Sequence, residues 1–543
     1  MLPVIIAGSG PVGLALALAL AGHGVPTVVL DGADGPPPPR LARTCVLPHD
    51  VARWAALPGV AEEAARWHAW RTTLRGRTVL REELDPERGP RHVPQHVLHR
   101  ALRDAAVRQE LVRLARGHRL TDIEQRGTEV VAHTVSHGPD GRREQNRQWR
   151  GSHLVGCDGA RSTVRKLLGI AFHGRTGVAR YAVAALRAEL PWPGEAGLHR
   201  SLPVGEVTVR PLTGGRWRLD WPLPADDGLV TPEALLERIH ATLAAWHGGD
   251  LPAYDLLDTG VHICHQRLAR SWRAGRVFLA GDAAHLLGAL GTQQVAEGLR
   301  DAENLAWKLA VACHEGRAET LLDSYQDERR TAVGVRLRAV DQALPLARAR
   351  DGLPSRLTGR GRGRLAWLSD GHLGRGTLGA PARYGASAIT RVPRGAQVTD
   401  TPVGAPAADV PVIALDGSAG PLRDRLGGPL LLVLTAPGAG VWDAKHWLSA
   451  GLMPELAATA ATLPLPAEVL VTEEYPGAGA HTLVIVRPDG YLAAALTGTD
   501  HQSLRECVET LRGATGESDD TDASGAPEDR EAPRVARRRA TGR

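Results

Sequence analysis

The stretch Gly281-Asp282-Ala283-Ala284-His285 decides the fold that we expect for this chain. It follows the apolar run Val277-Phe278-Leu279-Ala280, which predicts a strand, and the residues up to Lys308 predict a helix. Asp282 is therefore expected where a strand passes the chain to a helix N-terminus. Backbone N–H groups at such a position favour ligands that carry hydroxyls and phosphates.

A second crossing from strand to helix opens the chain. Val4-Ile5-Ile6-Ala7 predicts a short strand, and Gly8-Ser9-Gly10-Pro11-Val12-Gly13 has the G-x-G-x-x-G spacing ahead of an Ala/Leu-rich helix. The first glycine permits a tight turn, the second lets the backbone approach a pyrophosphate, and the third lets helix pack on strand. The next predicted strand, Val28-Val29-Leu30, ends in Asp31, which can accept hydrogen bonds from a ribose. Together these features predict a dinucleotide-binding site.

A third stretch, Val155-Gly156-Cys157-Asp158-Gly159-Ala160-Arg161-Ser162, also leads from apolar residues into a predicted helix. Asp158 and Asp282 lie far apart in sequence, which suggests one cofactor site assembled from discontinuous segments. A plain alternative stays open, because an Asp-Gly turn with Ser162 capping the helix needs no ligand.

Length and composition set further bounds. With 543 residues, 43% of them hydrophobic, the chain is expected to form two or three domains. The formal charge is +5, but the basic residues are almost all arginine and acids are interspersed among them, so we expect no nucleic-acid partner. The five cysteines are widely spaced and odd in number, which predicts no disulfide framework, no metal site and a reducing, cytoplasmic location.

No segment predicts membrane insertion. The apolar stretch from Ala7 to Ala21 lacks a preceding basic region and contains the glycine motif, so it is not interpreted as a signal peptide. Elsewhere no run of about eighteen apolar residues occurs.

The spacing of apolar and polar residues in the middle and at the end of the chain differs from that in the first part. Val207–Arg210 and Trp217–Trp221 alternate in polarity, which predicts an antiparallel sheet that holds the substrate. Leu98 to Gly117 has helical spacing, Leu305 to about Ala347 predicts a helical segment, and Arg360–Arg364 is interpreted as a flexible connection. Leu430–Leu434 and His481–Val486 predict buried strands of a separate unit.

Four motifs resemble the flavin-dependent aromatic hydroxylases of the para-hydroxybenzoate hydroxylase type, most closely the phenylpropionate and polyketide hydroxylases with a C-terminal thioredoxin-like domain. The motifs are Gly8–Gly13, Cys157–Ser162 through Gly169, Gly275–His285, and Leu322–Tyr325 with Glu328–Arg330. They cover residues 1 to about 335.

The resemblance implies an α/β fold in which a Rossmann-like FAD-binding domain carries an inserted antiparallel substrate sheet and is followed by a thioredoxin-like domain. The expected boundaries are 1–175 and 271–394 for the two parts of the FAD-binding domain with its helical connection, 176–270 for the substrate sheet, 395–515 for the thioredoxin-like domain and 516–543 for a disordered tail. The later domain contains no Cys-x-x-Cys, so a packing or dimer role is expected, in a monomer or homodimer.

The resemblance also assigns cofactor-binding residues. Asp31 is implied to hold the adenosine ribose of FAD, Arg43 the pyrophosphate, Gln95 the flavin chain, and Asp282 the ribityl chain or nearby phosphate. Asp158 belongs to a motif linked in the family to both FAD and NADPH. The expected cofactor set therefore comprises Gly8, Gly10, Gly13, Asp31, Arg43, Gln95, Asp158, Gly281, Asp282, Val295 and Ala296.

The chain departs from the family between Leu286 and Asp301, where the usual Pro-Pro pair and Gly-Gly-Gln-Gly-x-Asn are altered. This segment lies against the flavin ring in the family. The backbone N–H groups of Val295 and Ala296 are still expected to bind the ring at a helix start. Gln294 and Glu297, however, add bulk and an acid, and a negative charge there disfavours an anionic reduced ring.

Two functions follow. The first is an FAD-dependent monooxygenase that uses NADPH or NADH and O2 to hydroxylate an aromatic or polyketide intermediate. The alternative is a cyclase in which FAD is a scaffold for a [4+2] ring closure in spirotetronate-type polyketide biosynthesis, which depends on shape and orientation. We assign no catalytic residue. His285 is expected to stabilise its turn, and His265 is equally compatible with facing substrate or solvent.

Overall fold

The computed structural model describes residues 1–137, 144–224, 230–288, 294–316, 318–348, 359–385, 387–393, 395–438, 452–498 and 500–513. The tail predicted to be disordered, 516–543, lies outside these ranges, as do residues 289–293 of the departing segment.

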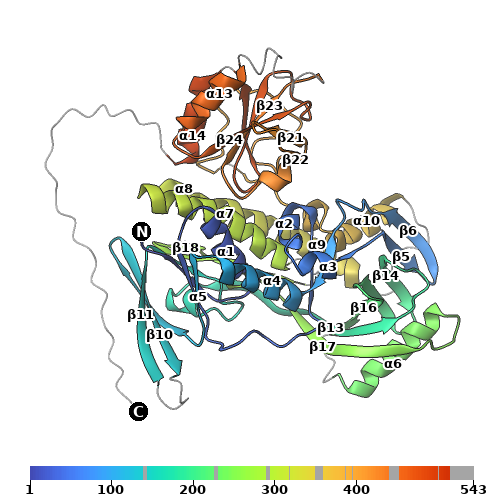
Figure 1. Ribbon diagram of the computed structural model, residues 1–543. Helices are drawn as coiled ribbons and strands as arrows, with labels where there is room; N and C mark the ends of the chain where they lie inside the picture. Colours follow the sequence, from blue (N-terminus) through green and yellow to red (C-terminus); the bar gives the residue numbers. More distant parts are fainter. Residues whose placement is uncertain are drawn as a thin grey trace.

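A mainly parallel sheet forms the centre of the N-terminal part (Figure 1). In the described ranges its order is β18-β19-β12-β1-β2-β8, with only the edge pair β18-β19 antiparallel. Its strands are β1 Val4–Ala7, β2 Thr27–Leu30, β8 Val112–Ala115, β12 His153–Gly156, β18 Arg273–Ala274 and β19 Val277–Leu279. Because parallel strands end at one edge, the residues after β19, β12, β1 and β2 meet there, as the discontinuous-site prediction required.

Helices and a small sheet cover this parallel sheet. Helix α1 (Pro11–Gly22) packs along it and contacts α4 (Gln95–Arg108) and α7 (Gln294–Glu315). The antiparallel sheet β9-β10-β11 shares its buried core through Val130, Ala132 and Trp149. These three strands are Arg119–Arg126, Glu129–His137 and Glu144–Gly151.

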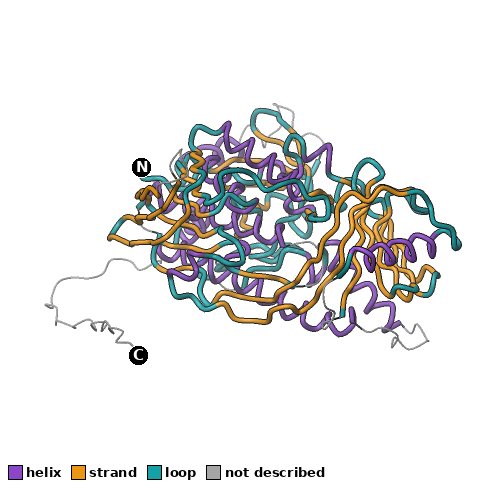
Figure 2. The backbone as a smooth tube through the Cα atoms, turned by 90° about the horizontal axis from the view of Figure 1, so that it is seen from below, coloured by secondary structure: helices purple, strands orange, loops and turns teal. Residues whose placement is uncertain are grey.

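A second large sheet extends to one side (Figures 1 and 2). Among the described residues its order is β20-β17-β13-β16-β15-β14-β5-β6, antiparallel except for the pair β14-β5. Its strands are β5 Ala69–Leu74, β6 Arg77–Glu83, β13 Phe172–Ala188, β14 Glu195–Leu202, β15 Gly205–Pro211, β16 Arg216–Leu223, β17 Tyr254–Ala269 and β20 His285–Leu287. Helix α6 (Pro232–Trp246) packs on it through Leu235, Ile239 and Leu243. The predicted strands Val207–Arg210 and Trp217–Trp221 are thus present in β15 and β16.

Short elements connect the two large sheets. They are β3 Thr44–Leu47, α2 Ala52–Ala55, α3 Val60–Glu63, β4 Ala65–Arg66, β7 Arg91–Pro94 and α5 Thr163–Leu167. After α7 follow α8 (Glu319–Tyr325), a π-helical stretch (Gln326–Arg330) and α9 (Thr331–Arg348), so the predicted helical segment is present with breaks.

Two local predictions are wrong. The helix predicted from Leu98 to Gly117 ends at Arg108, since the following residues turn and pair with β2 as β8. The predicted flexible connection at Arg360–Arg364 lies in helix α10 (Gly359–Leu373), which continues into the buried residues Leu365, Leu368 and Leu373 and is followed by α11 (Gly376–Gly379). Burial of that later apolar face outweighs the low helix propensity of the glycines.

A C-terminal α/β unit with its own sheet follows after residue 395, and it lies above α7 and α8 in Figure 1. Its boundaries and its thioredoxin-like fold stay predictions. In the described part of this unit the sheet order is β22-β21-β24-β23-β25-β26. Its elements are β21 Pro411–Ala414, β22 Ala419–Pro421, β23 Leu430–Thr435, α13 Leu452–Ala461, β24 Ala467–Thr472, β25 Thr482–Val486, β26 Leu492–Thr497 and α14 His501–Leu511.

Buried ion pairs attach this unit to the rest. Arg487 reaches the π-helical stretch, where its Nη1 lies 2.7 Å from Oε1 of Glu328. The same carboxylate accepts a 2.7 Å bond from Nζ of Lys308 in α7. All three side chains are fully buried, which makes the contact part of a folded core.

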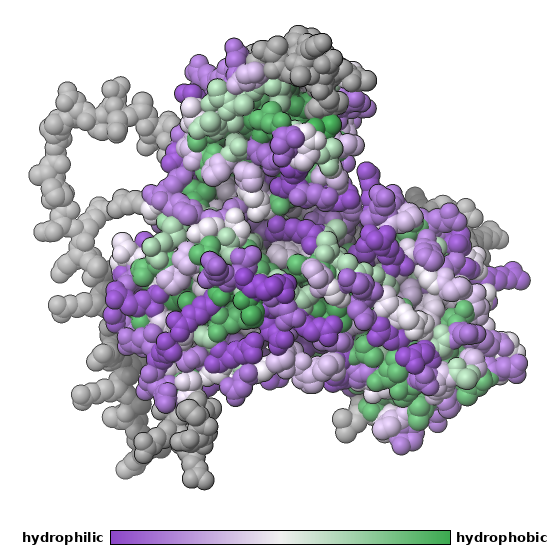
Figure 3. Space-filling view, in the orientation of Figure 1, coloured by the Kyte–Doolittle hydropathy of each residue, from purple (hydrophilic) through white to green (hydrophobic). Residues whose placement is uncertain are grey.

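The face of the molecule seen in Figure 3 is mostly hydrophilic, and its hydrophobic residues form separate groups. Among the helices that the structure describes, none combines the length and apolar character required to cross a bilayer.

Candidate cofactor and substrate site

The glycine loop after β1 combines close packing with open space. A Cβ on Gly8, which has φ +106°, would overlap the carbonyl oxygen of Cys157, and a Cβ on Gly13 would overlap the carbonyl oxygen of Gly8. A Cβ on Gly10 would meet no heavy atom within 4 Å. The first and third glycines therefore serve the fold, while the second leaves backbone open to a ligand at the start of α1.

Asp31 lies against this loop at the end of β2. Its Oδ2 accepts hydrogen bonds from the Ser9 backbone N–H at 2.9 Å and from the Ser9 hydroxyl, and its Oδ1 accepts one from Ala33 N–H at 2.8 Å. These bonds fix the carboxylate beside the loop, and its remaining lone pairs can accept from ribose hydroxyls.

Arg43 and Gln95 are brought together by the pairing of β3 with β7. Thr44 lies opposite Pro94 in this ladder, and the backbone N–H of Gln95 donates to the carbonyl oxygen of Arg43 at 2.9 Å. Within the described residues no side-chain hydrogen bond or ion pair engages the exposed Arg43 guanidinium. It is therefore available to an anionic ligand such as a pyrophosphate.

Asp158 lies near the others but is used differently. Its Oδ2 accepts hydrogen bonds from the backbone N–H groups of Thr163 and Val164, and Ser162 Oγ accepts from Arg165 N–H at the start of α5. Asp158 and Ser162 thus cap the start of α5, as expected for an Asp-Gly turn that needs no ligand. Asp158 Oδ1 is buried and has no partner in the described structure, so one acceptor stays unused.

The segment around Asp282 differs from the expected helix start. Gly281, at φ +61°, begins a 3-10 turn (Gly281–Ala283), then β20 pairs with β17, and α7 begins only at Gln294. The prediction that Asp282 directly precedes a helix is wrong, because Gly281 redirects the chain into the second sheet. Asp282 nevertheless contacts that helix, since its Oδ1 accepts a 2.6 Å bond from Nε2 of Gln294. Desolvation raises the pKa of Asp282.

The helix start itself is in place. Val295 lines the cavity described below and Ala296 is buried, both in the first turn of α7, where backbone N–H groups lack helical partners. Gly281 is not among the residues that line the cavity, and its N–H donates to Oδ2 of Asp301 at 2.9 Å.

The prediction that Glu297 places an uncompensated negative charge near the flavin ring is wrong. This carboxylate is 2% exposed, and it forms ion pairs with Arg300, Arg329 and Arg336, the last at 2.6 Å. Burial alone would raise the pKa of Glu297, but the three guanidinium groups outweigh burial and hold it well below the usual value. Its charge is thus compensated within the protein.

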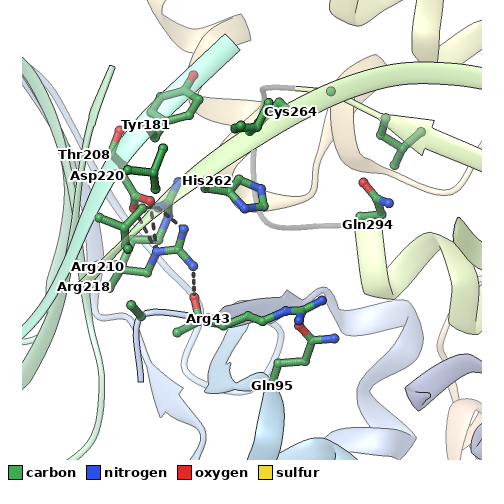
Figure 4. A pocket seen from close by; sticks show the side chains of 18 of the residues that line it. Arg43, Gln95, Tyr181, Thr208, Arg210, Arg218, Asp220, His262, Cys264 and Gln294 are labelled. Carbon is green, nitrogen blue, oxygen red and sulfur yellow. Dashed lines mark hydrogen bonds and ion pairs between the residues drawn. The ribbon is translucent and has the colours of Figure 1, made fainter. Parts of the chain in front are cut away.

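A cavity of about 480 Å³ joins the cofactor segments to the second sheet (Figure 4). Figure 4 shows Arg43 next to Gln95, and it shows Gln294 opposite the strands that carry Tyr181, Thr208 and Asp220. The large sheet contributes polar walls from β13, β15, β16 and β17. These residues are Tyr181, Thr208, Arg210, Arg218, Asp220, His262 and Cys264.

An ion-paired cluster forms part of the polar wall. Asp220 Oδ2 lies 2.6 Å from Nη1 of Arg210, and its Oδ1 lies 2.6 Å from Nη2 of Arg218. Burial would raise the pKa of Asp220, but the guanidinium groups of Arg218 and Arg210 outweigh burial and lower it. Arg218 also donates to Thr44 Oγ1 at 2.8 Å, and Arg210 donates to Nδ1 of His372 at 3.1 Å.

Histidines near the site have different roles. His285 is fully buried, with Nε2 2.8 Å from Oδ2 of Asp301, which supports the prediction that it stabilises its turn. His265 lines the cavity and its Nδ1 accepts from Gly177 N–H at 3.1 Å. His262, which the sequence did not single out, also lines the cavity, and desolvation lowers its pKa, which favours a neutral imidazole.

The residues present fit an FAD molecule. The open backbone at Gly10, the unengaged Arg43 and the start of α1 match a pyrophosphate. Asp31 lies against the glycine loop, where a ribose is expected, and Asp282 lines the cavity that would receive the flavin ring.

The structure thus adds a wall that the sequence did not predict. Alternation identified the strands of the large sheet, but it did not indicate that Arg210, Arg218 and Asp220 meet in the cavity. One sequence feature could have indicated this wall. Arg210, Arg218 and Asp220 are charged residues within strands that were otherwise expected to be buried.

Comparisons with known proteins agree with this geometry. Residues 1–339 match the family described as "FAD binding domain". The dialkyldecalin synthase of Streptomyces rugosporus is 35% identical over 347 residues, covering 61% of this chain and 69% of that protein. The 6-methylpretetramide 4-monooxygenase of Streptomyces rimosus is 34% identical over 350 residues, covering 62% of this chain and 60% of that protein. The chain therefore matches less than two thirds of the second relative's length.

A solved structure extends the likeness of fold beyond the matched region. The flavin-dependent monooxygenase PieE, in complex with FAD and substrate, superposes with a TM-score of 0.71 at 23% identity over 94% of this chain and 99% of that one. At this identity the comparison supports the architecture alone. From the family match over more than half of its length, this chain belongs to the FAD-binding domain family.

Proposed function

We propose that this protein is an FAD-dependent hydroxylase that inserts one oxygen atom from O2 into an aromatic or polyketide natural-product intermediate. In such a reaction a substrate C–H, O2, NADPH or NADH and a proton give a substrate C–OH, the oxidised nicotinamide and water. FAD carries the electrons from the nicotinamide to oxygen when bound.

One observation carries the proposal: a single cavity touches both the cofactor segments and the large sheet. Arg43, Gln95, Asp282 and Val295 line it from one side, and the sheet strands line it from the other. Its volume of about 480 Å³ is in the range of small-molecule sites. A substrate there would lie directly beside a bound flavin ring.

The cavity also has surfaces for a flat apolar body. Val183, Leu198, Val261, Ile263, Leu286 and Leu287 contribute apolar side chains to its lining. They would exclude water from a bound ring and orient it, which supports attack at one position.

The compensation of Glu297 favours redox function. An uncompensated acid near the ring would oppose a negatively charged reduced cofactor. Because three arginines form ion pairs with Glu297, its charge does not oppose reduction of the flavin in this way.

The test is anaerobic mixing of purified FAD-loaded protein with NADPH, and separately with NADH, in the presence of candidate polyketides. We expect the oxidised-flavin absorbance to bleach, and subsequent addition of O2 to give a product heavier by one oxygen. Protein without substrate measures the uncoupled reaction. Oxidised flavin that persists while product forms would exclude the hydroxylase.

A second candidate is the FAD-scaffolded cyclase that closes a [4+2] ring. The 35% identity to a dialkyldecalin synthase and the altered segment after Leu286 favour it. A cyclase product has the same mass as its precursor, so mass spectrometry of the product distinguishes the two candidates.

A further inference from the structure

The buried wall of the cavity carries more positive than negative charge. Arg210 and Arg218 share one carboxylate, Asp220, and the three side chains are 4%, 5% and 5% exposed, respectively. A buried guanidinium without a full counter-charge is costly, because its desolvation is not offset by an ion pair.

Nearby groups do not remove this excess. Glu206 also lines the cavity, but its Oε2 already lies 2.8 Å from Nε of Arg200, and burial raises the pKa of Glu206. Arg40 is paired with Asp258 at 3.0 Å. The imidazole of His372 accepts from Arg210 and stacks on Trp70, and burial lowers its pKa to about 3, so it adds no charge.

Arg210 keeps an unused donor. Its Nη1 and Nη2 are engaged by Asp220 and His372, whereas its Nε is buried and has no partner among the described residues. Arg218, by contrast, uses all three nitrogens on Asp220 and Thr44. Asp220, His372 and Thr44 thus engage the two guanidinium groups, and the Nε of Arg210 is left without a partner among the described residues.

We propose that the Arg210–Arg218–Asp220 cluster recognises a delocalised oxygen anion on the substrate, either a carboxylate or the enolate of a 1,3-dicarbonyl group. One anion oxygen would accept the Nε–H of Arg210, and the anion would supply the missing counter-charge. The anionic end would lie on the large sheet, so the opposite, apolar end of the substrate faces the cofactor side. This assignment rests on the cavity being the substrate site of the proposed function.

The two sources of such an anion are distinguished by paired probes. Full-length FAD-loaded protein is titrated by equilibrium dialysis with 3-hydroxy-2-naphthoate and its neutral amide, and with 2-acetylcyclohexane-1,3-dione and neutral 2-acetylcyclohexanone. We expect at least one acidic probe to bind tenfold or more tightly than its neutral partner. The pair that discriminates more strongly identifies the substrate anion.

Variants test whether the preference for the acidic probe depends on the Arg210–Arg218–Asp220 cluster. Arg210→Gln and Arg218→Gln should each reduce the preference for the acidic probe at least tenfold. Arg187→Gln is the matched control, because Arg187 lies on β13 of the same sheet in an exposed pair with Asp255, and it should leave the preference unchanged. Arg210→Lys keeps the charge but loses the Nε donor, so it should retain only part of the preference.

Equal binding of acidic and neutral probes by the unaltered protein would overturn the proposal, whatever the variants do. A preference retained in both glutamine variants would also overturn it. The experiment involves no redox turnover. An anion preference in a protein whose flavin is never reduced would therefore reject the hydroxylase and keep the anion site.

Discussion

At the scale of single residues, the site depends on residues that are held in place by hydrogen bonds to residues of other elements. Asp282 is fixed by Gln294, and Arg43 is placed by the backbone of Gln95. Each of these pairs joins a segment of the cofactor half to the first turn of a helix. The position of a carboxylate or guanidinium toward FAD therefore depends on its partner as much as on its own identity.

Replacement of Asp282 tests this dependence. Asp282→Ala removes an acceptor next to the expected ribityl chain, and a hydrogen bond to a charged group contributes about 1.5–3 kcal/mol. We expect FAD affinity to fall about tenfold or more, measured by flavin fluorescence after dialysis. Asp323→Ala is the control, since Asp323 is 65% exposed in a surface pair with Arg273. Equal flavin retention in the two variants would contradict the assignment.

His372 should make the protein sensitive to acid. Burial lowers its pKa to about 3 from 6.5, so between these values the unfolded chain binds a proton that the folded protein does not. Its stabilising contribution is present above pH 6.5 and is lost as the pH falls toward 3, by about 2 kcal/mol at pH 5. Urea unfolding at pH 7.5 and pH 5 should show a smaller difference in His372→Asn than in the unaltered protein.

The readout in that experiment is the change between the two pH values, because His372→Asn also alters absolute stability. His173→Asn, at an exposed position, controls for loss of an imidazole. An unchanged pH difference in His372→Asn would show that this histidine does not contribute.

At the scale of elements, the sequence predicted those helices, strands and turns that depend on residues close to one another in the chain. The glycine loop, β1, β2 and β23 follow from apolar runs and turn residues that are adjacent in sequence. The pairing of β5 with β14 joins segments far apart, and no local pattern encodes it. Likewise, the end of α4 at Arg108 depends on β8 pairing with β2, so helical spacing alone extended it too far.

The same distinction explains the site. The positions of Gly8, Asp31 and Asp282 were predictable because each lies within three residues after the end of a strand in one mainly parallel sheet. Arg210 and Asp220 meet because β15 and β16 pair in one register and face the cofactor half. That arrangement is a tertiary property, and a single sequence does not specify it.

The glycine loop gives an element-scale prediction. Gly13→Ala should destabilise the FAD-free protein, because the new Cβ would overlap the carbonyl oxygen of Gly8. Gly10→Ala should leave that stability nearly unchanged but weaken FAD binding at least tenfold, because its Cβ enters only the space of the ligand. Thermal unfolding without FAD and the dissociation constant of FAD separate the two effects. Similar behaviour of both variants would contradict this division.

At the scale of the whole molecule, one buried carboxylate joins the C-terminal unit to the FAD-binding part. Glu328 contacts Lys308 and Arg487, and burial lowers the pKa of Lys308 to about 8 despite the opposing charge of Glu328. Removal of this shared partner leaves the buried Lys308 without a carboxylate and leaves Arg487 with Asp489 as its remaining carboxylate partner among the described residues.

Glu328→Gln should therefore lower the free energy of unfolding by about 3–5 kcal/mol. Limited proteolysis should also cut the connection before residue 395 sooner. Glu319→Gln is the matched control, since Glu319 is 70% exposed in its pair with Arg273. A cost below about 1 kcal/mol for Glu328→Gln would show that the C-terminal unit is held by other contacts.

The long strands β13 and β17 affect how the substrate preference of this protein can evolve. By their pairing they connect β20, which begins three residues after Asp282, to the strands β15 and β16 that carry Arg210 and Asp220. Selection for a new substrate can therefore act on the distal half of one continuous sheet, while the cofactor half stays under its own selection. In the proposed function, a graft of β14 to β16 between relatives should therefore change the preferred substrate and leave the FAD-binding segments unaltered.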